Sequence, residues 1–309
     1  MSGNPPTVDS RDSAGQAASS SSLFAQGRTV LEMIKIEHTL FALPFAFLGM
    51  LLAAEGWPSW QVVGWIVVAM VGARSAAMGF NRLIDRQVDG ENPRTADRAL
   101  PAGLVSPRFV GLFILASVVV FLVAAWRLNS LALRLAPIAL LVLLGYSYTK
   151  RFTAFSHLVL GLALGGAPLG AWVAVRGDVT ATPLMLMAIV LCWVAGFDVL
   201  YSLQDLEFDR DRGLHSIPAL LGSRGALWAS GLLHLVMLAL LVLLPRVYPP
   251  GLGAVYWLGV AGCIALLVYQ HAILLPGDLS RLDAAFFQAN GLLAVWLLAA
   301  TAVDRWLAG

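Results

Sequence analysis

Apolar residues dominate this chain in long runs, and polar residues gather in short segments between them. Each run is long enough to cross a bilayer as a helix, which takes about 20 residues. The runs do not alternate with a period of two, and an open strand would leave backbone groups unpaired in lipid, so we expect helices. The nine predicted membrane helices cover residues 30–54, 60–84, 107–126, 129–147, 154–175, 182–204, 225–244, 251–274 and 284–305. The pattern therefore predicts an all-α integral membrane protein.

The composition agrees with this fold class and sets the N-terminus apart. Hydrophobic residues make up 59% of the chain and charged residues only 12%, and the mean hydropathy is +0.79. Residues 1–26 are instead rich in Ser, Gly and Ala, so we expect a disordered cytoplasmic tail there and a transmembrane domain over residues 27–309. Cys192 and Cys263 lie inside apolar runs and are predicted to pack between helices rather than to form a disulfide.

The distribution of positive charge predicts how the chain is oriented. With nine spans, the N-terminal tail and the connections after the second, fourth, sixth and eighth helices share one side of the membrane. That side holds fourteen of the 20 Lys and Arg residues and the other side five, while Arg74 lies within the second helix. Because cytoplasmic loops carry an excess of Lys and Arg, we expect the N-terminus and the larger share of charge in the cytoplasm.

Two short segments hold half of the 18 acidic residues. They are residues 81–103 and 198–213, at the cytoplasmic ends of the second and sixth predicted helices. Asp85 and Asp205 are 120 residues apart, and so are Asp89 and Asp209, which indicates two four-helix repeats followed by one further helix.

The spacing of these carboxylates points to a metal site. Asn81, Asp85 and Asp89 follow each other at intervals of four residues, which places them on one face of a helix or the first turn beyond it. In the second segment we expect a shared face in the same way for Asp198, Tyr201, Ser202, Asp205 and Asp209. Carboxylates so close repel one another unless a cation lies between them. Two such pairs facing each other suit Mg²⁺, which takes carboxylates together with substrate phosphates. The alternative is that these charges are solvated helix ends, but two copies beside arginines favour a functional site.

The bases nearby extend this argument to a substrate. Arg94, Arg98, Lys150 and Arg151 could hold phosphate oxygens, so acids, bases and an apolar membrane domain together indicate a diphosphate ester with an apolar tail. Ionisable residues within spans are costly and usually functional. Arg74 is one such residue, and the alternative for it is a structural ion pair with Asp198.

Four segments resemble the UbiA superfamily of intramembrane prenyltransferases, over about residues 30–305. "NRLIDRQVD" matches the NxxxDxxxD motif of the family, and "DVLYSLQDLEFD" is similar to its DxxYxxxDxxxD motif. "NPRTADRALPAG" resembles the arginine-bearing loop after the first motif, and "YSYTKRFT" (146–153) the aromatic and basic segment after the fourth helix. One departure is His215, where many members carry Lys.

The resemblance implies nine helices around a central cavity and assigns roles to named residues. The implied Mg²⁺ ligands are Asp85, Asp89, Asp205 and Asp209, with Asn81 assisting. The implied contacts to the diphosphate are Arg94, Arg98, Tyr146 and Lys150, and Tyr201 of the second motif is expected to bind substrate as well. Arg74 matches a position that meets the carboxylate of an aromatic acceptor, and Asp198 an acid beside the reacting ring.

The activity implied is transfer of a polyprenyl group from polyprenyl diphosphate to an aromatic hydroxy acid in quinone (ubiquinone or menaquinone) biosynthesis, in a bacterial inner membrane. 4-Hydroxybenzoate is the expected acceptor, and the alternative is the dihydroxynaphthoate of the futalosine route. The expected partners are these substrates and the lipid bilayer, with no nucleic acid, and the oligomeric state is open. An alternative from another class of protein is a cation-coupled transporter, and its best support is the Gly- and Pro-rich stretch 160–172. We expect that stretch to be a close-packed or kinked helix lining the cavity.

Overall fold

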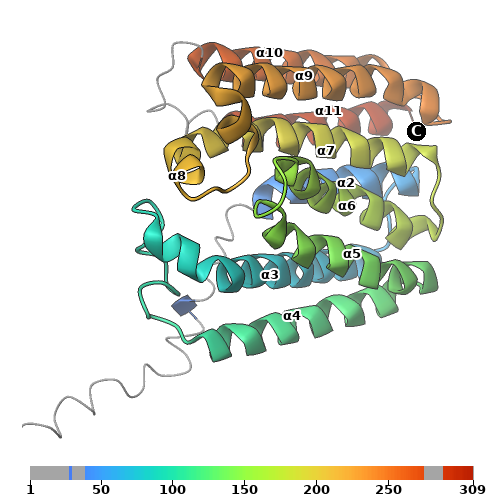
Figure 1. Ribbon diagram of the computed structural model, residues 1–309. Helices are drawn as coiled ribbons and strands as arrows, with labels where there is room; N and C mark the ends of the chain where they lie inside the picture. Colours follow the sequence, from blue (N-terminus) through green and yellow to red (C-terminus); the bar gives the residue numbers. More distant parts are fainter. Residues whose placement is uncertain (1–27, 30–38, 275–287, 309) are drawn as a thin grey trace, which may run out of the picture.

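The structure is a computed structural model of the 309-residue chain and describes residues 28–29, 39–274 and 288–308 (Figure 1). These residues form helices joined by turns and loops, with no strand among them. The predicted disordered tail and the first part of the predicted span 30–54 lie outside the described residues.

Nine apolar helices account for most of the described chain, which confirms the predicted number. Eight of them are long and apolar enough to cross a membrane, and a shorter one has its apolar part at Ala42–Ala54. They are α2 (Thr39–Ala54), α3 (Trp60–Glu91), α4 (Pro107–Leu128), α5 (Ser130–Thr149), α6 (Ser156–Arg176), α7 (Ala181–Tyr201), α9 (Ile217–Val247), α10 (Ala254–Leu274) and α11 (Asn290–Ala308). A short 3₁₀ turn, η2 (Ser202–Asp205), and α8 (Leu206–Asp211) follow α7.

Polar residues at the helix starts determine where several of these helices begin. Ser106 caps α4 by accepting a hydrogen bond from the N–H of Phe109, and Pro107 follows it as the first helical residue. Ser216 caps α9 in the same way, again with a proline in the first turn. The helix α9 is kinked at Gly222, which has φ of 70°, so its first residues turn away from the membrane-spanning part.

Successive helices place their connections alternately at two ends of the bundle (Figure 1). The α3–α4 loop, the α5–α6 loop and the segment from η2 to the start of α9 lie at one end, which we call the charged end. The C-terminal end of α11 lies at the opposite end, as predicted from the alternation of spans. Both acidic segments therefore lie on one side of the bundle.

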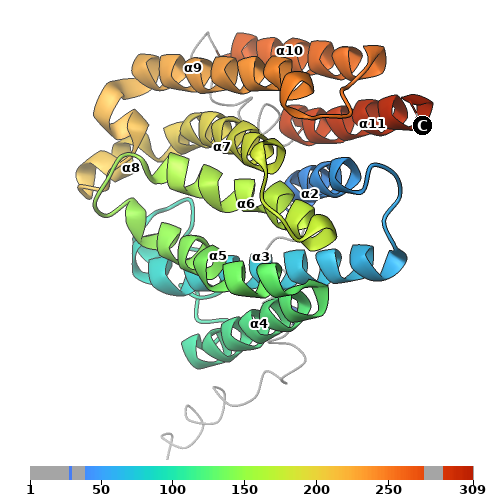
Figure 2. The same cartoon turned by 90° about the vertical axis from the view of Figure 1, so that its right-hand side faces the viewer.

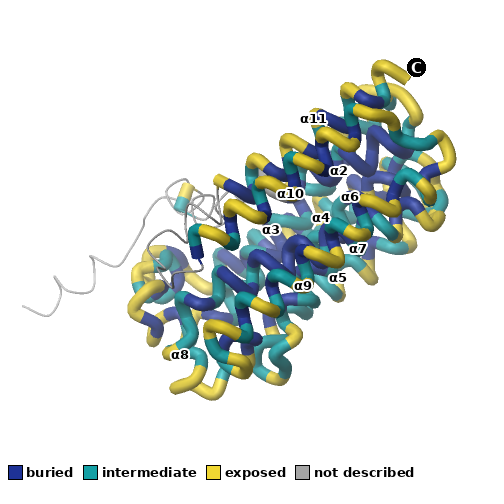
Figure 3. Tube along the Cα trace, turned by 90° about the horizontal axis from the view of Figure 1, so that it is seen from above, coloured by how far each residue is buried: buried dark blue, intermediate teal, exposed yellow. Residues whose placement is uncertain are grey.

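The outer surface is apolar, as a lipid-facing surface should be. Exposed residues cover the outside of the bundle and buried ones its inside (Figure 3). Large side chains such as Leu141 and Trp228 are 74% and 82% exposed. Four exposed tryptophans gather at the opposite end, where amphipathic rings mark a membrane–water interface. They are Trp57, Trp60, Trp126 and Trp306.

The helix α6 packs closely against α7, which has the most buried membrane-spanning segment (Figure 2). A Cβ atom at Gly161 would overlap the backbone carbonyl of Leu191, and one at Gly165 would lie 2.6 Å from the carbonyl oxygen of Met187. Glycine at these positions lets the two backbones approach. The stretch 160–172 is therefore a close-packed part of one continuous helix, and the contact fixes the register between the start of α6 and the end of α7.

We predict that Gly161→Ala destabilises the protein and that Gly166→Ala does not. The added methyl group at Gly161 must push α7 away, at a cost of about 1–3 kcal/mol. A Cβ atom at Gly166 meets open space in the same helix, and alanine there favours the helix by roughly 0.5–1 kcal/mol. Thermal unfolding of both variants in one detergent tests this, and equal midpoints would contradict the close contact.

Candidate active site

The first acidic motif lies on the last turns of α3, within the helix. The helix continues to Glu91, seven residues beyond the predicted boundary, which lies at the end of the apolar run. Asp85 and Asp89 are both buried, with residue exposures of 3% and 6%. The four-residue spacing therefore places both carboxylates on one buried face, as the sequence predicts.

Asp85 is surrounded by groups from two segments, α3 itself and the α5–α6 loop. The side-chain amide of Asn81 donates to its Oδ2 atom at 3.1 Å, and Lys150 Nζ lies 3.1 Å from the same oxygen. Arg151 contacts Oδ1 at 3.2 Å and also donates to the carbonyl of Ile84. Lys150 and Arg151 come from the α5–α6 loop, so this carboxylate holds that loop against the end of α3.

Asp89 is paired mainly with Arg98 of the loop after α3. The guanidinium of Arg98 donates to Oδ1 at 2.7 Å, and that of Arg82 lies 3.9 Å from Oδ2. Thr95 donates its hydroxyl to the carbonyl of Asp89 and pins the loop start. The buried Oδ2 atom of Asp89 accepts no hydrogen bond from any described residue. This oxygen therefore has a nearby positive charge from Arg82 but no hydrogen-bond donor among the described residues.

The second acidic motif does not form one helical face. This corrects the expectation that one face of a helix or its first turn beyond carries Asp198, Tyr201, Ser202, Asp205 and Asp209. The helix α7 ends at Tyr201, and η2 changes the direction of the chain before α8 begins. The η2 turn breaks the 3.6-residue period, because a 3₁₀ turn has three residues per turn. Asp205 and Asp209 consequently lie on a separate short segment at the charged end.

Asp205 is held by the α3–α4 loop. Arg94 Nε donates to its Oδ1 atom at 2.9 Å, a second guanidinium nitrogen donates to Oδ2, and the Asn92 amide donates to Oδ1 at 2.9 Å. Burial lowers the pKa of Arg94, but the hydrogen bond and charge of Asp205 outweigh it and raise that pKa above its ordinary value. The Arg94 guanidinium also lies over the Tyr201 ring, 5.8 Å from its centroid.

Two further contacts close the charged end. The backbone N–H of His215 donates to the carbonyl of Lys150 at 2.8 Å, and Arg212 pairs with Glu91 at 2.7 Å. Asp209 lies near the Ser216 side chain at the start of α9. The structure thus brings together both acidic segments, the arginine-bearing loop and the segment after α5.

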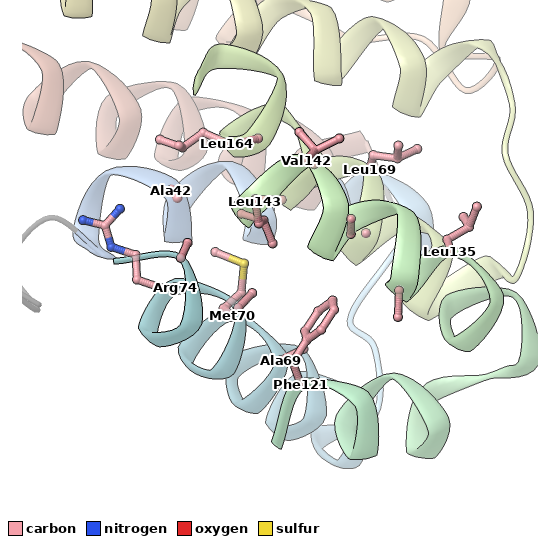
Figure 4. Close-up of a pocket in the computed structure, with 18 of the residues that line it drawn as sticks. Ala42, Ala69, Met70, Arg74, Phe121, Leu135, Val142, Leu143, Leu164 and Leu169 are labelled. Carbon is pink, nitrogen blue, oxygen red and sulfur yellow. The ribbon is translucent and has the colours of Figure 1, made fainter. Parts of the chain in front are cut away.

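An apolar cavity of about 400 Å³ lies between α2, α3, α4, α5 and α6. Apolar side chains dominate its wall, among them Met70, Phe121 and Leu143 (Figure 4). Arg74 lies at one end of the cavity, with Phe121 and Leu135 toward the other. Tyr146 also lines it and is within electrostatic range of Arg74, Asp85 and Asp198. The Nε atom of Arg74 is buried and donates to no described residue.

Asp198 is paired with a residue that sequence reasoning missed. Its Oδ2 atom lies 2.7 Å from Nδ1 of His157, a buried residue in the first turn of α6. None of the ion pairs between described residues joins Asp198 to Arg74, which removes the structural alternative considered for Arg74. Asn92 and Arg82 were likewise missed, because neither belongs to the DxxxD spacing.

The donor chemistry of this site fits a hard divalent cation. Four aspartates supply carboxylate oxygens, which Mg²⁺ prefers, and one buried oxygen of Asp89 has no hydrogen-bond donor among described residues. The described residues contain no group of three or more His, Cys, Asp or Glu side chains close enough to form a ready-made metal cluster. The carboxylates instead contact cations, so ligand groups would have to exchange partners when a metal–diphosphate enters.

Comparison with known proteins gives one family. Residues 42–298 match the UbiA prenyltransferase family. The chain is 31% identical over 268 residues to a 4-hydroxybenzoate octaprenyltransferase of Aliivibrio fischeri, covering 87% of this chain and 90% of the relative. It is 34% identical over 269 residues to a 4-hydroxybenzoate octaprenyltransferase of Vibrio cholerae, covering 87% and 91%.

Solved structures agree with this match. The apo structure of a UbiA homolog from Aeropyrum pernix K1 has a TM-score of 0.79 at 36% identity and covers 87% of this chain and 98% of that one. A UbiA homolog from Archaeoglobus fulgidus bound to GPP and Mg²⁺ has a TM-score of 0.66 at 18% identity, covering 90% and 99%. The second likeness concerns the fold alone.

Proposed function

This chain belongs to the UbiA prenyltransferase family, and we propose that it transfers a polyprenyl group from polyprenyl diphosphate to 4-hydroxybenzoate in quinone biosynthesis. The observation that carries the proposal is that carboxylates and cations at the charged end meet an apolar cavity with Arg74 in its wall. The charged end suits a diphosphate, and the cavity suits the apolar part of the donor. The names of the relatives support 4-hydroxybenzoate as the acceptor.

The diphosphate would be held by the residues that now neutralise the carboxylates. Asp85, Asp89, Asp205 and Asp209 would hold Mg²⁺, with Asn81 orienting Asp85 through its hydrogen bond. When bound, the metal supplies positive charge to the departing diphosphate. Arg94, Arg98 and Lys150 would bind the remaining phosphate oxygens, and Tyr146 and Tyr201 would lie beside them. The basic side chains can exchange a carboxylate for a phosphate because both accept charge-assisted hydrogen bonds.

The chemistry would proceed between the charged end and the cavity. The allylic C–O bond breaks and the diphosphate leaves with the electron pair, while the apolar cavity excludes water from the allylic cation. A carbon of the phenol ring forms the new C–C bond and then loses its proton. Asp198 would polarise the phenol or accept that proton. Arg74 would hold the carboxylate of the acceptor.

The two alternative functions are less well supported. Dihydroxynaphthoate also carries a phenol and a carboxylate, so Arg74 fits it equally well, but the relatives carry the 4-hydroxybenzoate name. The transporter reading is disfavoured by the family match and by the continuous helix α6 over the Gly-rich stretch.

The protein is an integral membrane protein, and we infer that it lies in a bacterial inner membrane with the charged end in the cytoplasm. The bias of Lys and Arg toward that end supports this orientation. A reporter fused after Gly309 should therefore read on the far side of the membrane, and a cytoplasmic signal would reverse the assignment.

The proposed function is tested by offering the membrane-embedded protein a labelled polyprenyl diphosphate and an equal mixture of 4-hydroxybenzoate and dihydroxynaphthoate. We expect mass spectrometry to find prenylated 4-hydroxybenzoate as the main product, and no product after Mg²⁺ is chelated. If prenylated dihydroxynaphthoate is the main product, dihydroxynaphthoate is the acceptor in place of 4-hydroxybenzoate. Labelled diphosphate that crosses the membrane chemically unchanged would favour a transporter.

We predict that alanine at Asp85, Asp89, Asp205 or Asp209 abolishes turnover without unfolding the protein. Each change removes a carboxylate from the metal while the membrane helices remain packed. The matched control is Asp97→Ala, because Asp97 lies exposed in the same loop as Arg94 and Arg98. Initial rates across a Mg²⁺ titration give the readout, and full activity of one variant at ordinary Mg²⁺ would remove that residue from the metal site.

We predict that Arg74→Lys raises the KM for the acceptor on the order of tenfold or more, because lysine keeps the charge but loses the two-pronged grip on a carboxylate. The KM for the prenyl diphosphate should stay nearly constant, since Arg74 lies seven residues before Asn81, about two helical turns deeper. Steady-state rates with each substrate varied separately measure both values. An unchanged acceptor KM, or equal use of phenols lacking a carboxylate, would contradict this role.

A further inference from the structure

His157 is a buried histidine that makes polar contacts through both ring nitrogens. Its exposure is 3%, and it lies in the first turn of α6. Nδ1 lies 2.7 Å from Asp198 Oδ2, and Nε2 lies 3.3 Å from the backbone nitrogen of Ile217. Asp198 belongs to α7 and Ile217 begins α9, so a single ring connects three helices at the charged end.

The two contacts together determine the protonation of the ring. The backbone N–H of Ile217 can only donate, so Nε2 of His157 must be the acceptor and carries no proton. The proton of the neutral ring therefore lies on Nδ1, which donates it to Asp198. This tautomer is assigned from the hydrogen-bond partners. In this tautomer Nδ1 of His157 donates its proton to Oδ2 of Asp198. The other carboxylate oxygen, Oδ1, receives no hydrogen bond from His157.

We propose that His157 is a positioning residue for the prenyl transfer, holding Asp198 in the orientation in which its other oxygen meets the acceptor ring. This inference rests on the proposed function. The side chain of Asp198 is 24% exposed while that of His157 is 4% exposed, so the carboxylate is partly accessible and the imidazole that contacts it is buried. His157 does not touch substrate in this arrangement and acts only through Asp198.

The backbone contact of His157 ties Asp198 to the second metal-binding segment. Ile217 directly follows Ser216, which caps α9 and lies near Asp209. Asp209 therefore lies near the helix start to which Asp198 is joined through His157 and Ile217.

Stability alone does not account for the pair. Burying an aspartate and a histidine costs desolvation, and apolar residues of similar size at such places are often neutral or stabilising. His271 provides a matched control, because it also contacts a side chain, Ser230, and a backbone carbonyl, Leu267, but no acidic residue. A loss of turnover that follows His157 but not His271 separates positioning from packing.

The test is a set of four variants assayed with the full-length protein in bilayers. His157→Leu should lower kcat about tenfold to a hundredfold, the range for lost partners behind a functional group, and leave the KM for prenyl diphosphate unchanged. His157→Gln should restore most of the rate, because its amide can donate to Asp198 and accept from Ile217. The asparagine side chain is too short to reach both partners, so His157→Asn should lose as much rate as His157→Leu. The asparagine variant serves in place of the leucine variant if the latter unfolds. His271→Leu, the matched control, should keep its rate.

A double-mutant cycle with Asp198→Asn decides whether His157 acts through Asp198. Replacing His157 by Leu in that background should change kcat little, since the group it positions is already lost. The inference would be overturned if the losses in kcat from His157→Leu and Asp198→Asn multiply in the double variant, or if His157→Gln is as slow as His157→Leu. The proposed function would stand in either case. If the unchanged protein forms no prenylated product, the proposed function fails, and the positioning role fails with it.

Discussion

Carboxylates buried beside lipid must be neutralised, and the arrangement of the charged end follows from this requirement. A buried charge is tolerated only when it is paired and hydrogen-bonded. Asp85 and Asp89 are buried at the end of α3, and the cations that pair with them come from other segments, Arg98 from the next loop and Lys150 from the loop after α5. Neutralising two aspartates therefore draws two loops across the end of the bundle.

The same helix connects this polar end to the apolar cavity. Along α3, Asp89 and Asp85 lie among cations, Asn81 supports Asp85, and Arg74 reaches the cavity wall. A molecule with a charged head and an apolar tail meets both environments along one helical face. The helix α3 is itself held by close packing against α4, where a Cβ atom at Gly72 would lie 2.8 Å from the backbone nitrogen of Phe121.

The sequence predicts contacts that follow a helical period and misses those made across the fold. The nine spans and the shared face of Asn81, Asp85 and Asp89 could be read from apolar runs and four-residue spacing. The continuous face expected in the second motif was wrong, because η2 interrupts the helix after Tyr201. The partner of Asp198 could not be found this way, since His157 is 41 residues from it and 60 from Ile217, and no local pattern relates them.

The contact between His215 and Lys150 has a consequence for how this site can vary. It joins the N–H of one peptide group to the carbonyl of another, so neither side chain takes part. The His215 side chain itself is exposed. A substitution at position 215 can therefore change the local charge while the backbone hydrogen bond between the two loops is kept. Sequence variation at this position is therefore compatible with an unchanged backbone framework at the charged end.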